Sequence, residues 1–431
     1  MSESPRSLLA SINGQPVGIV REEGGAWSFE YAQSWTHGKD TCDLAPSLPR
    51  SDNRIIDGAS SRPVQWFFDN LLPEEAARDL LARDARIASA DAFGLLAYFG
   101  RESAGAITLL APDEAPTESS YHLLSDEELH HRISQLPHHA LATGAPKRMS
   151  LAGAQHKLAV SIRDGQLWHP VGDAPSTHIL KPDHKDADLY PQSTVNEFFV
   201  MRLAHEMGLQ VPSVTLRYVP DPVYLIERFD RKLIGQQPIR LHVVDACQLL
   251  GIDRTFKYQQ CRLETLVRCI QLCQNRALAR QRLLAWTLFN ILTGNGDAHL
   301  KNLSFLVKPT GVELAPFYDL VATECYRAEL GNIPRWPATR LSMPIGKAET
   351  FDAVARESFI GFAVELGGTR QAATRLLNEF CSKIEQAAEL VYEEFTKTPS
   401  PADSQRAAEL RVLRSIRFVV IRDMVSRLNI K

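Results

Sequence analysis

The chain has 431 residues, of which 44% are hydrophobic and 23% are charged. These proportions are ordinary for a folded protein, and they exclude disordered, collagen-like and disulfide-scaffold chains. At roughly 150 residues per domain, the length predicts two large or three small domains. The 48 basic and 51 acidic residues leave a net charge of −3, which is too little positive charge to coat a nucleic acid or an anionic membrane over a whole face.

The start of the chain and its cysteines indicate a cytoplasmic protein. Met1 to Arg6 lack the basic and apolar stretches of a signal peptide. The longest apolar stretch, Leu283 to Leu292, is about half a membrane span. Seven cysteines without a Cys-x-x-Cys pair favour free buried thiols over disulfides or a zinc ribbon. We therefore expect neither secretion nor membrane insertion.

In chain order, short β-prone pieces alternate with Asn-Gly and Gly-Gly breakers from Leu8 to about Leu48, which predicts small antiparallel strands. Helices are predicted from Asn70 to about Arg86, with Pro73 near the start, and from Asp91 to Phe99. Residues 111–120 are rich in turn formers and predict a linker. Ser125 and Glu128 then form the pattern of a capping box, which opens a short helix.

A second β-rich stretch runs from about Ser150 to Phe229, interrupted by a helix predicted from Ser193 to Met207 and ended by Gly208. Beyond about Leu241, long helical patterns replace the strand signals, at 263–274, 278–292, 372–395 and 404–428. A small mixed lobe followed by a larger helical lobe is typical of a kinase-like fold. We expect an α+β, bilobal, protein-kinase-like fold with a small mixed α/β N-lobe, a large all-helical C-lobe and an extra N-terminal α/β subdomain.

One loop has the spacing that phosphate transfer needs. In the kinase catalytic loop an Asp base is followed five residues later by an Asn that holds magnesium. Asp297 and Asn302 have this step of five, just past the apolar helix ending near Leu292. Each residue alone is more often a turn former or a helix cap.

A second metal-binding Asp should follow after a short hairpin. Leu303 to Val307 and a turn at Lys308 to Gly311 predict the hairpin, and Asp319 follows it. Upstream, Lys181 ends a β-prone stretch, and Glu197 lies on the next helix, where it could orient that lysine as in kinases. A strand lysine is otherwise usually edge protection, so the order along the chain decides between the two interpretations.

These residues also carry a resemblance. The segments Ser150-Leu-Ala-Gly153-Ala-Gln-His-Lys157, His178-Ile-Leu-Lys-Pro, Leu225-Ile-Glu-Arg-Phe-Asp-Arg231, Gly296-Asp-Ala-His-Leu-Lys-Asn302 and Pro316-Phe-Tyr-Asp319 together resemble the HipA family of bacterial Ser/Thr kinase toxins. The front of the chain is similar to the N-terminal domain of that family through Asp69-Asn-Leu-Leu-Pro-Glu74 and Phe93-Gly-Leu-Leu96. The resemblance covers nearly the whole chain.

The resemblance implies that Asp297 is the catalytic base, that Asn302 and Asp319 hold magnesium, and that Lys181 contacts nucleotide phosphates. It implies that Glu227-Arg228-Phe229 is the hinge for adenine and that Ser150 is autophosphorylated. Only Gly153 stands where a protein-kinase loop has three glycines, so the phosphate loop depends on the resemblance. The residues expected to bind nucleotide or magnesium are Ser150, Ala152, Gly153, Ala154, Gln155, Lys157, Lys181, Glu197, Glu227, Arg228, Phe229, Asn302 and Asp319.

The expected domains are an N-terminal subdomain at 1–110, a linker with a short helix at 111–146, an N-lobe with the phosphate loop and the nucleotide lysine at 147–240, and a C-lobe with the catalytic loop and magnesium ligands at 241–431. Because every residue expected to do chemistry lies after Lys147, the first 110 residues are expected to dock a partner or shape target access.

Other features keep two interpretations. Near the proposed base, Lys301 could neutralise the γ-phosphate, and His299 could act in catalysis or only shape the loop. The His130-His131 and His138-His139 pairs favour exposed surface over a metal site. The basic C-terminal segment from Ser404 favours a solvated helix face over a surface for DNA or an acidic partner.

The function expected from the resemblance is an ATP- and Mg²⁺-dependent Ser/Thr protein kinase toxin that phosphorylates an aminoacyl-tRNA synthetase, such as glutamyl-tRNA synthetase, arrests growth, promotes persistence and is inactivated by autophosphorylation. The expected partner is a HipB-like helix-turn-helix antitoxin, through which operator DNA is mainly contacted. The alternatives are a catalytically silent co-repressor and a small-molecule kinase.

Overall fold

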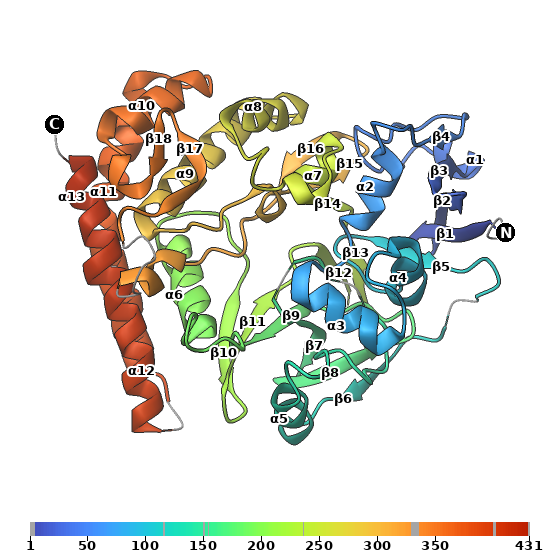
Figure 1. Cartoon of the computed structure of the whole chain (residues 1–431), viewed down its shortest axis with the longest axis horizontal. Coiled ribbons are helices and arrows are strands. Elements are labelled where there is room, and N and C mark those ends of the chain that lie inside the picture. The colour runs from blue at the N-terminus through green and yellow to red at the C-terminus, as the bar shows by residue number, and fades with distance from the viewer. Residues whose placement is uncertain are drawn as a thin grey trace. The chain divides into compact units, whose positions relative to one another are not determined.

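The computed structural model describes residues 5–114, 117–149, 151–153, 155–235, 237–328, 336–399 and 402–429. Its contacts divide the chain into two compact units (Figure 1). Unit 1 comprises Met1–Lys181, Ile226–Lys257 and Ser304–Ala315, and unit 2 comprises Pro182–Leu225, Tyr258–Leu303 and Pro316–Lys431. The expected division at 110, 146 and 240 stays a prediction.

Unit 1 begins with an antiparallel five-stranded sheet of order β4-β3-β2-β1-β5. Two-residue turns at Asn13-Gly14 and Gly24-Gly25 join its first three strands, as the breakers predicted. Helices α2 and α4 pack beside it, and the Trp27 and Phe93 rings meet edge to face at 5.0 Å. The elements are β1 (Arg6–Ile12), β2 (Gln15–Glu23), β3 (Ala26–Tyr31), α1 (Gln33–Thr36), β4 (Ile55–Ile56), α2 (Pro63–Asp69), α3 (Glu75–Ala85), α4 (Ala92–Phe99) and β5 (Ile107–Leu110).

A second sheet of unit 1 contains the neighbouring strands β9-β7-β8-β6, and a third has the order β14-β15-β16. Ser125 caps α5 by accepting the Glu128 N–H at 3.1 Å, which is one half of the expected capping box, while the Glu128 carboxylate accepts a hydrogen bond from Arg132. The elements are β6 (Ser120–Leu123), α5 (Asp126–Ser134), β7 (Leu158–Arg163), β8 (Gln166–Val171), β9 (His178–Pro182), β12 (Arg231–Ile234), β13 (Gln237–Arg240), β14 (Val243–Asp245), α7 (Ala246–Leu250), η1 (Arg254–Phe256), β15 (Ser304–Lys308) and β16 (Gly311–Leu314).

Unit 2 is mostly helical, and its long helix α11 packs against α6, α9 and α13. Their apolar faces supply buried side chains such as Phe199, Leu288 and Leu377. The elements are α6 (Ser193–Glu206), β10 (Val214–Tyr218), β11 (Pro222–Glu227, which ends in unit 1), α8 (Leu263–Leu272), α9 (Arg276–Thr293), η2 (Leu300–Asn302), η3 (Thr323–Ala328), β17 (Arg340–Ile345), β18 (Ala348–Thr350), η4 (Phe351–Ala353), α10 (Arg356–Glu365), α11 (Arg370–Thr396), α12 (Asp403–Arg414), a π-helical turn η5 (Ser415–Ile421) and α13 (Arg422–Asn429).

The α+β class is confirmed, but the expectation of an all-helical region after residue 241 is wrong. Strands β14 to β18 lie in that region; the hairpin of β15 and β16 was predicted, whereas β14, β17 and β18 were not. Strand β14 is only three residues long, and it pairs with β15 about sixty residues later. A segment of three residues is too short to show an alternating pattern. Its hydrogen bonds also come from a distant part of the chain, which no local pattern indicates.

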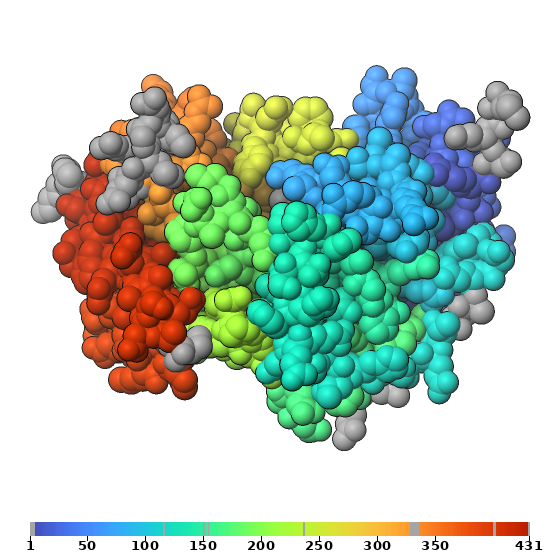
Figure 2. Space-filling model, turned by 60° about the horizontal axis from the view of Figure 1, so that its bottom comes forward, coloured from blue at the N-terminus to red at the C-terminus, as the bar shows by residue number. Residues whose placement is uncertain are grey.

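Several arginine side chains of the basic C-terminal segment form hydrogen bonds with other residues of the chain. Arg406 donates to the Thr398 carbonyl at 2.7 Å, Arg414 donates to the Tyr392 hydroxyl at 3.0 Å, and Arg427 donates to Asp423 at 2.8 Å. The outer side of these helices is visible in red in Figure 2. These bonds favour the helix-face interpretation over a surface for nucleic acid.

Two further expectations can be compared with the structure. All seven cysteines are free and buried, as predicted. His130, His131, His138 and His139 are exposed, and the described residues contain no cluster of three or more His, Cys, Asp or Glu that could hold a metal. Within the described ranges, no helix has both the length and the apolarity that a membrane span requires.

Candidate active site

The predicted catalytic loop begins where α9 ends. Gly294 adopts φ +62° after Thr293, and a Cβ atom there would lie 2.6 Å from Val420 Cγ1, so glycine is needed for both conformation and space. The Asn295 amide oxygen accepts the Asp297 N–H at 3.0 Å, and the Thr323 hydroxyl accepts the Gly296 N–H at 2.7 Å. The Asn295 and Thr323 side chains therefore hold the backbone of the loop at Gly296 and Asp297.

The Asp297 side chain is 46% exposed. Its Oδ1 atom accepts a hydrogen bond from the Tyr258 hydroxyl and lies 3.8 Å from His299 Nε2. His299 is buried, and the Tyr258 ring meets its ring edge to face at 4.8 Å. A carboxylate that is held on one side and open to solvent on the other suits a general base.

Asn302 and Asp319 are brought toward this loop by backbone contacts. The Asn302 side-chain amide donates to the Asp297 carbonyl at 2.8 Å, so one bond spans the predicted step of five. Tyr318 donates its hydroxyl to the Lys301 carbonyl at 2.7 Å. Asp319 therefore follows a residue that is bonded to the neighbour of Asn302. Its φ of +52° is a strained backbone conformation of the kind that gathers at functional sites.

Tyr224 links Glu197 to this part of unit 2. Its side chain is fully buried, and burial together with the negative charges of Glu197 and Asp319 raises its pKa well above the usual value. Glu197 is itself only 3% exposed. Two carboxylates predicted to act at one site therefore lie near the same buried phenol.

The described part of the phosphate loop lies in unit 1. Gly153 has φ +108°, and its carbonyl accepts the Glu74 N–H at 3.2 Å beside a bridge to Pro73. Lys157 Nζ donates to the Ala152 carbonyl at 2.6 Å, and a Cβ atom on Gly153 would lie 2.6 Å from Nζ. Ser150 and Ala154 lie outside the described residues.

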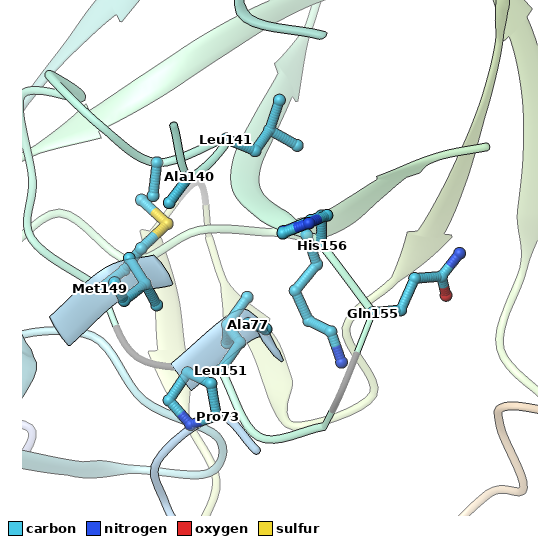
Figure 3. A pocket seen from close by; sticks show the side chains of 11 residues that line it. Pro73, Ala77, Ala140, Leu141, Met149, Leu151, Gln155 and His156 are labelled. Atoms are coloured by element: carbon cyan, nitrogen blue, oxygen red, sulfur yellow. The ribbon is translucent and has the colours of Figure 1, made fainter. Parts of the chain in front are cut away.

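A pocket that is open to solvent adjoins this loop (Figure 3). Met149 and Gln155 lie on opposite sides of it in the view, and Ala77 of α3 lines it as well. Gln155 and Lys157, both expected to bind nucleotide, therefore share a cavity with the N-terminal segment. The lining residues are Pro73, Ala77, Leu81, Ala140, Leu141, Ala142, Met149, Leu151, Gln155, His156 and Lys157.

Lys181 lies near the end of β9 and is 5% exposed. It belongs to unit 1 and Glu197 to unit 2, so their expected pairing stays a prediction. In the expected hinge, the Arg228 N–H donates to the Thr177 carbonyl at 2.9 Å. The Arg228 N–H is therefore already engaged within the chain.

The Arg228 side chain belongs to a buried ion cluster centred on Glu102. Arg228, Lys147, Arg231 and Arg240 all lie within 3.1 Å of its carboxylate. Burial by itself raises the pKa of Glu102, but the four positive charges outweigh it and hold that pKa well below the usual range. The Arg228 side chain therefore ties the expected hinge segment to this buried cluster.

The sequence predicted site roles for the loop residues Asp297, His299, Lys301 and Asn302, which stay predictions, and Lys301 is buried within η2. It did not identify Tyr258, Tyr224, Tyr318 or Glu102. The Tyr258 contact joins residues 39 positions apart, and no local motif marks such a pair.

Comparison with known proteins gives the family. Residues 8–110 match the HipA N-terminal domain, and residues 149–388 match the HipA-like C-terminal domain. The chain belongs to the HipA family. The resemblance inferred from the motifs is thereby confirmed.

The similar proteins span most of the chain. "Putative kinase Y4mE" of Sinorhizobium fredii is 33% identical over 404 residues, covering 90% of this chain and 92% of its own. The serine/threonine-protein kinase toxin HipA of Shewanella oneidensis is 32% identical over 323 residues, covering 70% and 71%. The solved complex of Shewanella oneidensis HipA with HipB and operator DNA aligns with a TM-score of 0.80 and 25% identity over 98% of this chain and 97% of that chain. This alignment confirms the kinase-like HipA fold.

Proposed function

We propose that this HipA-family chain is an ATP- and Mg²⁺-dependent serine/threonine protein kinase and the toxin of a toxin–antitoxin pair. The observation that supports the proposal is the catalytic loop. The Asp297 side chain is nearly half-exposed, and Asn302, five residues later, donates its side-chain amide to the Asp297 carbonyl. Tyr318, next to Asp319, donates its hydroxyl to the Lys301 carbonyl. The same order of Asp, Asn and Asp serves phosphate transfer in protein kinases.

In this proposal Asp297 accepts the proton of the incoming serine hydroxyl while the serine oxygen bonds to the γ-phosphorus atom of ATP. The bond from that phosphorus to the β-phosphate oxygen breaks, and ADP leaves with the electron pair. Lys181 would neutralise nucleotide phosphates, with Glu197 orienting it, and Lys301 would offset charge at the γ-phosphate. The loop from Ala152 to Lys157 would cover the phosphates.

The donor chemistry fits magnesium. Asn302 donates its amide N–H to Asp297, so its carbonyl oxygen points elsewhere, and Asp319 offers a carboxylate. Oxygen ligands from one or two side chains, completed by water and phosphate, are what Mg²⁺ takes in such enzymes. When bound, the ion would offset the negative charge of the phosphates.

The proposed partner and target are supported by membership of the family. The Shewanella oneidensis relative was solved with HipB and operator DNA, so a HipB-like antitoxin is proposed here, with DNA contacted mainly through it. The proposed target is a serine of an aminoacyl-tRNA synthetase such as glutamyl-tRNA synthetase. A phosphoserine adds about −2 charge, which would repel ATP from the target's own site and arrest translation and growth. Autophosphorylation of Ser150 would switch the kinase off.

The test is phosphate transfer from labelled ATP to purified glutamyl-tRNA synthetase by the full chain, with Asp297→Asn and Asp319→Asn as variants. Asp297→Asn should lower kcat by about 10²- to 10⁴-fold and leave ATP affinity nearly unchanged. Asp319→Asn should also weaken Mg²⁺-dependent ATP binding. Near-normal transfer by Asp297→Asn would show that the catalytic assignment is wrong.

The same measurement separates the alternatives. A wild-type chain that binds ATP and antitoxin but labels no protein, either in this assay or in a bacterial lysate, would be a silent co-repressor. Label found only in small metabolites would indicate a small-molecule kinase.

A further inference from the structure

Tyr258 contacts the catalytic loop of unit 2 at two places. Its hydroxyl donates to Asp297 Oδ1, and its ring meets the His299 ring edge to face at 4.8 Å with an interplanar angle of 81°. The residue is 43% exposed, so core packing alone does not explain an aromatic side chain here. One side chain therefore touches both the proposed base and the histidine two residues after it.

The turn that carries Tyr258 is fastened to the same loop. The Cys261 N–H donates to the Tyr258 carbonyl at 3.0 Å, and the Cys261 thiol lies 3.6 Å from the Ala298 carbonyl. Cys261 is fully buried. Because Cys261 contacts both the Tyr258 carbonyl and the Ala298 carbonyl next to Asp297, the backbone that carries the phenol is held against the backbone that carries the carboxylate.

The two carboxylate oxygens of Asp297 differ in their surroundings. Oδ1 faces Tyr258 and His299. Among the residues that the structure describes, Oδ2 has no hydrogen-bond partner, and the side chain is nearly half-exposed. A hydrogen bond to one oxygen fixes the rotation of the carboxylate and presents the other oxygen to an incoming hydroxyl.

We propose that Tyr258 is a positioning residue that holds the Asp297 carboxylate for phosphate transfer. The inference rests on the proposed function, since it takes Asp297 as the base. A base must lie within hydrogen-bond reach of the proton that it accepts, and a displacement of about 1 Å can cost 10²-fold in rate. Loss of the hydroxyl should therefore lower kcat and leave nucleotide binding unchanged.

The experiment compares three full-length variants with the wild type in the transfer assay, together with direct ATP binding and the melting temperature. Tyr258→Phe removes the hydroxyl but keeps the ring on His299, and Tyr258→Ala removes both. Tyr392→Phe is the matched control, because Tyr392 is a partly exposed tyrosine of unit 2 whose hydroxyl accepts a hydrogen bond from Arg414, on α12.

Tyr258→Phe should lower kcat by about 10- to 100-fold, with KM for ATP, ATP affinity and melting temperature unchanged. Tyr258→Ala should lose at least as much, and Tyr392→Phe should lose nothing. Wild-type kcat in Tyr258→Phe would overturn the proposal. A raised kcat would overturn it too, since the hydroxyl would then be occupying the place of the acceptor.

The result also distinguishes this inference from the proposed function. If the wild type transfers phosphate and Asp297→Asn does not, the proposed function holds whatever Tyr258→Phe does. If the wild type binds ATP but transfers nothing, the proposed function fails first. A parallel loss of ATP affinity and melting temperature in Tyr258→Phe would assign Tyr258 a structural role and contradict positioning.

Discussion

His242 is buried in unit 1, and its Nε2 atom lies 2.7 Å from the Leu44 carbonyl oxygen. Burial lowers the pKa of His242 to about 4, although the hydrogen bond to Leu44 acts in the opposite direction. The ring is therefore neutral in the folded chain at neutral pH and donates its N–H to that carbonyl.

This depressed pKa predicts how stability changes with pH. In the unfolded chain the histidine pKa is about 6.5. Between pH 6.5 and 4 the unfolded state therefore binds a proton that the folded state does not, and the free energy of unfolding decreases as pH falls. From pH 7.5 to 5.5 the contribution to the free energy of unfolding should drop by about 1 kcal/mol. Urea unfolding at the two pH values measures it. His242→Asn should flatten this dependence, whereas His138→Asn, which changes an exposed ring, should not.

At the same scale, a local spacing in the sequence predicted which residues share one loop, while their catalytic roles stay predictions. The step from Asp297 to Asn302 places both residues on one loop, and a single hydrogen bond spans it. Glu102 could not be found in this way, because its partners stand 45 to 138 positions away. A lone Glu after a short helix looks like any surface carboxylate until the fold brings four cations around it.

Among the elements, α9 was predictable because its apolar residues recur at helical spacing and Gly294 ends it. The π-helical turn η5 was not, because the sequence from Ser415 to Ile421 keeps an ordinary helical pattern. Its Val420 side chain packs at Gly294, so the C-terminal helix contributes to the start of the catalytic loop. Neither segment alone indicates that contact.

The contact gives a prediction for Gly294→Ala. The left-handed backbone and the 2.6 Å approach to Val420 should together cost about 2 to 4 kcal/mol in the free energy of unfolding. Gly208→Ala is the matched control, because Gly208 follows α6 at φ +79° with no atom within 4 Å of its added Cβ, so only the backbone cost of about 1 to 2 kcal/mol applies. Urea unfolding compares the two. Equal losses would mean that the Val420 contact does not constrain the loop.

For the molecule as a whole, the sequence suggested that the first 110 residues stand apart from the catalytic part. That separation stays a prediction, and Met1–Lys181 lies in one compact unit. Glu74 bonds the Gly153 carbonyl through its N–H, and its carboxylate lies 2.5 Å from Lys257 Nζ. The N-terminal segment therefore supports both the phosphate loop and the residue before Tyr258.

The buried cluster around Glu102 allows a test of whether the rest of the chain depends on the N-terminal segment. A chain that begins at residue 111 lacks Glu102, so Arg228 and Arg231 keep only the Asp230 carboxylate. Lys147 and Arg240 lose the carboxylate with which they pair. Removing one partner from a buried pair costs about 3 to 5 kcal/mol, and here one carboxylate serves four cations. The fragment 111–431 should therefore fail to fold or to bind ATP, and co-expression of residues 1–110 should restore both.

Glu102→Gln in the full chain should lower the free energy of unfolding by a similar amount, whereas Glu30→Gln, at an exposed pair with Arg21, should change it by less than about 1 kcal/mol. Circular dichroism, urea unfolding and ATP binding measure these outcomes, and a folded fragment that binds ATP like the full chain would show that the first 110 residues are a separable domain after all.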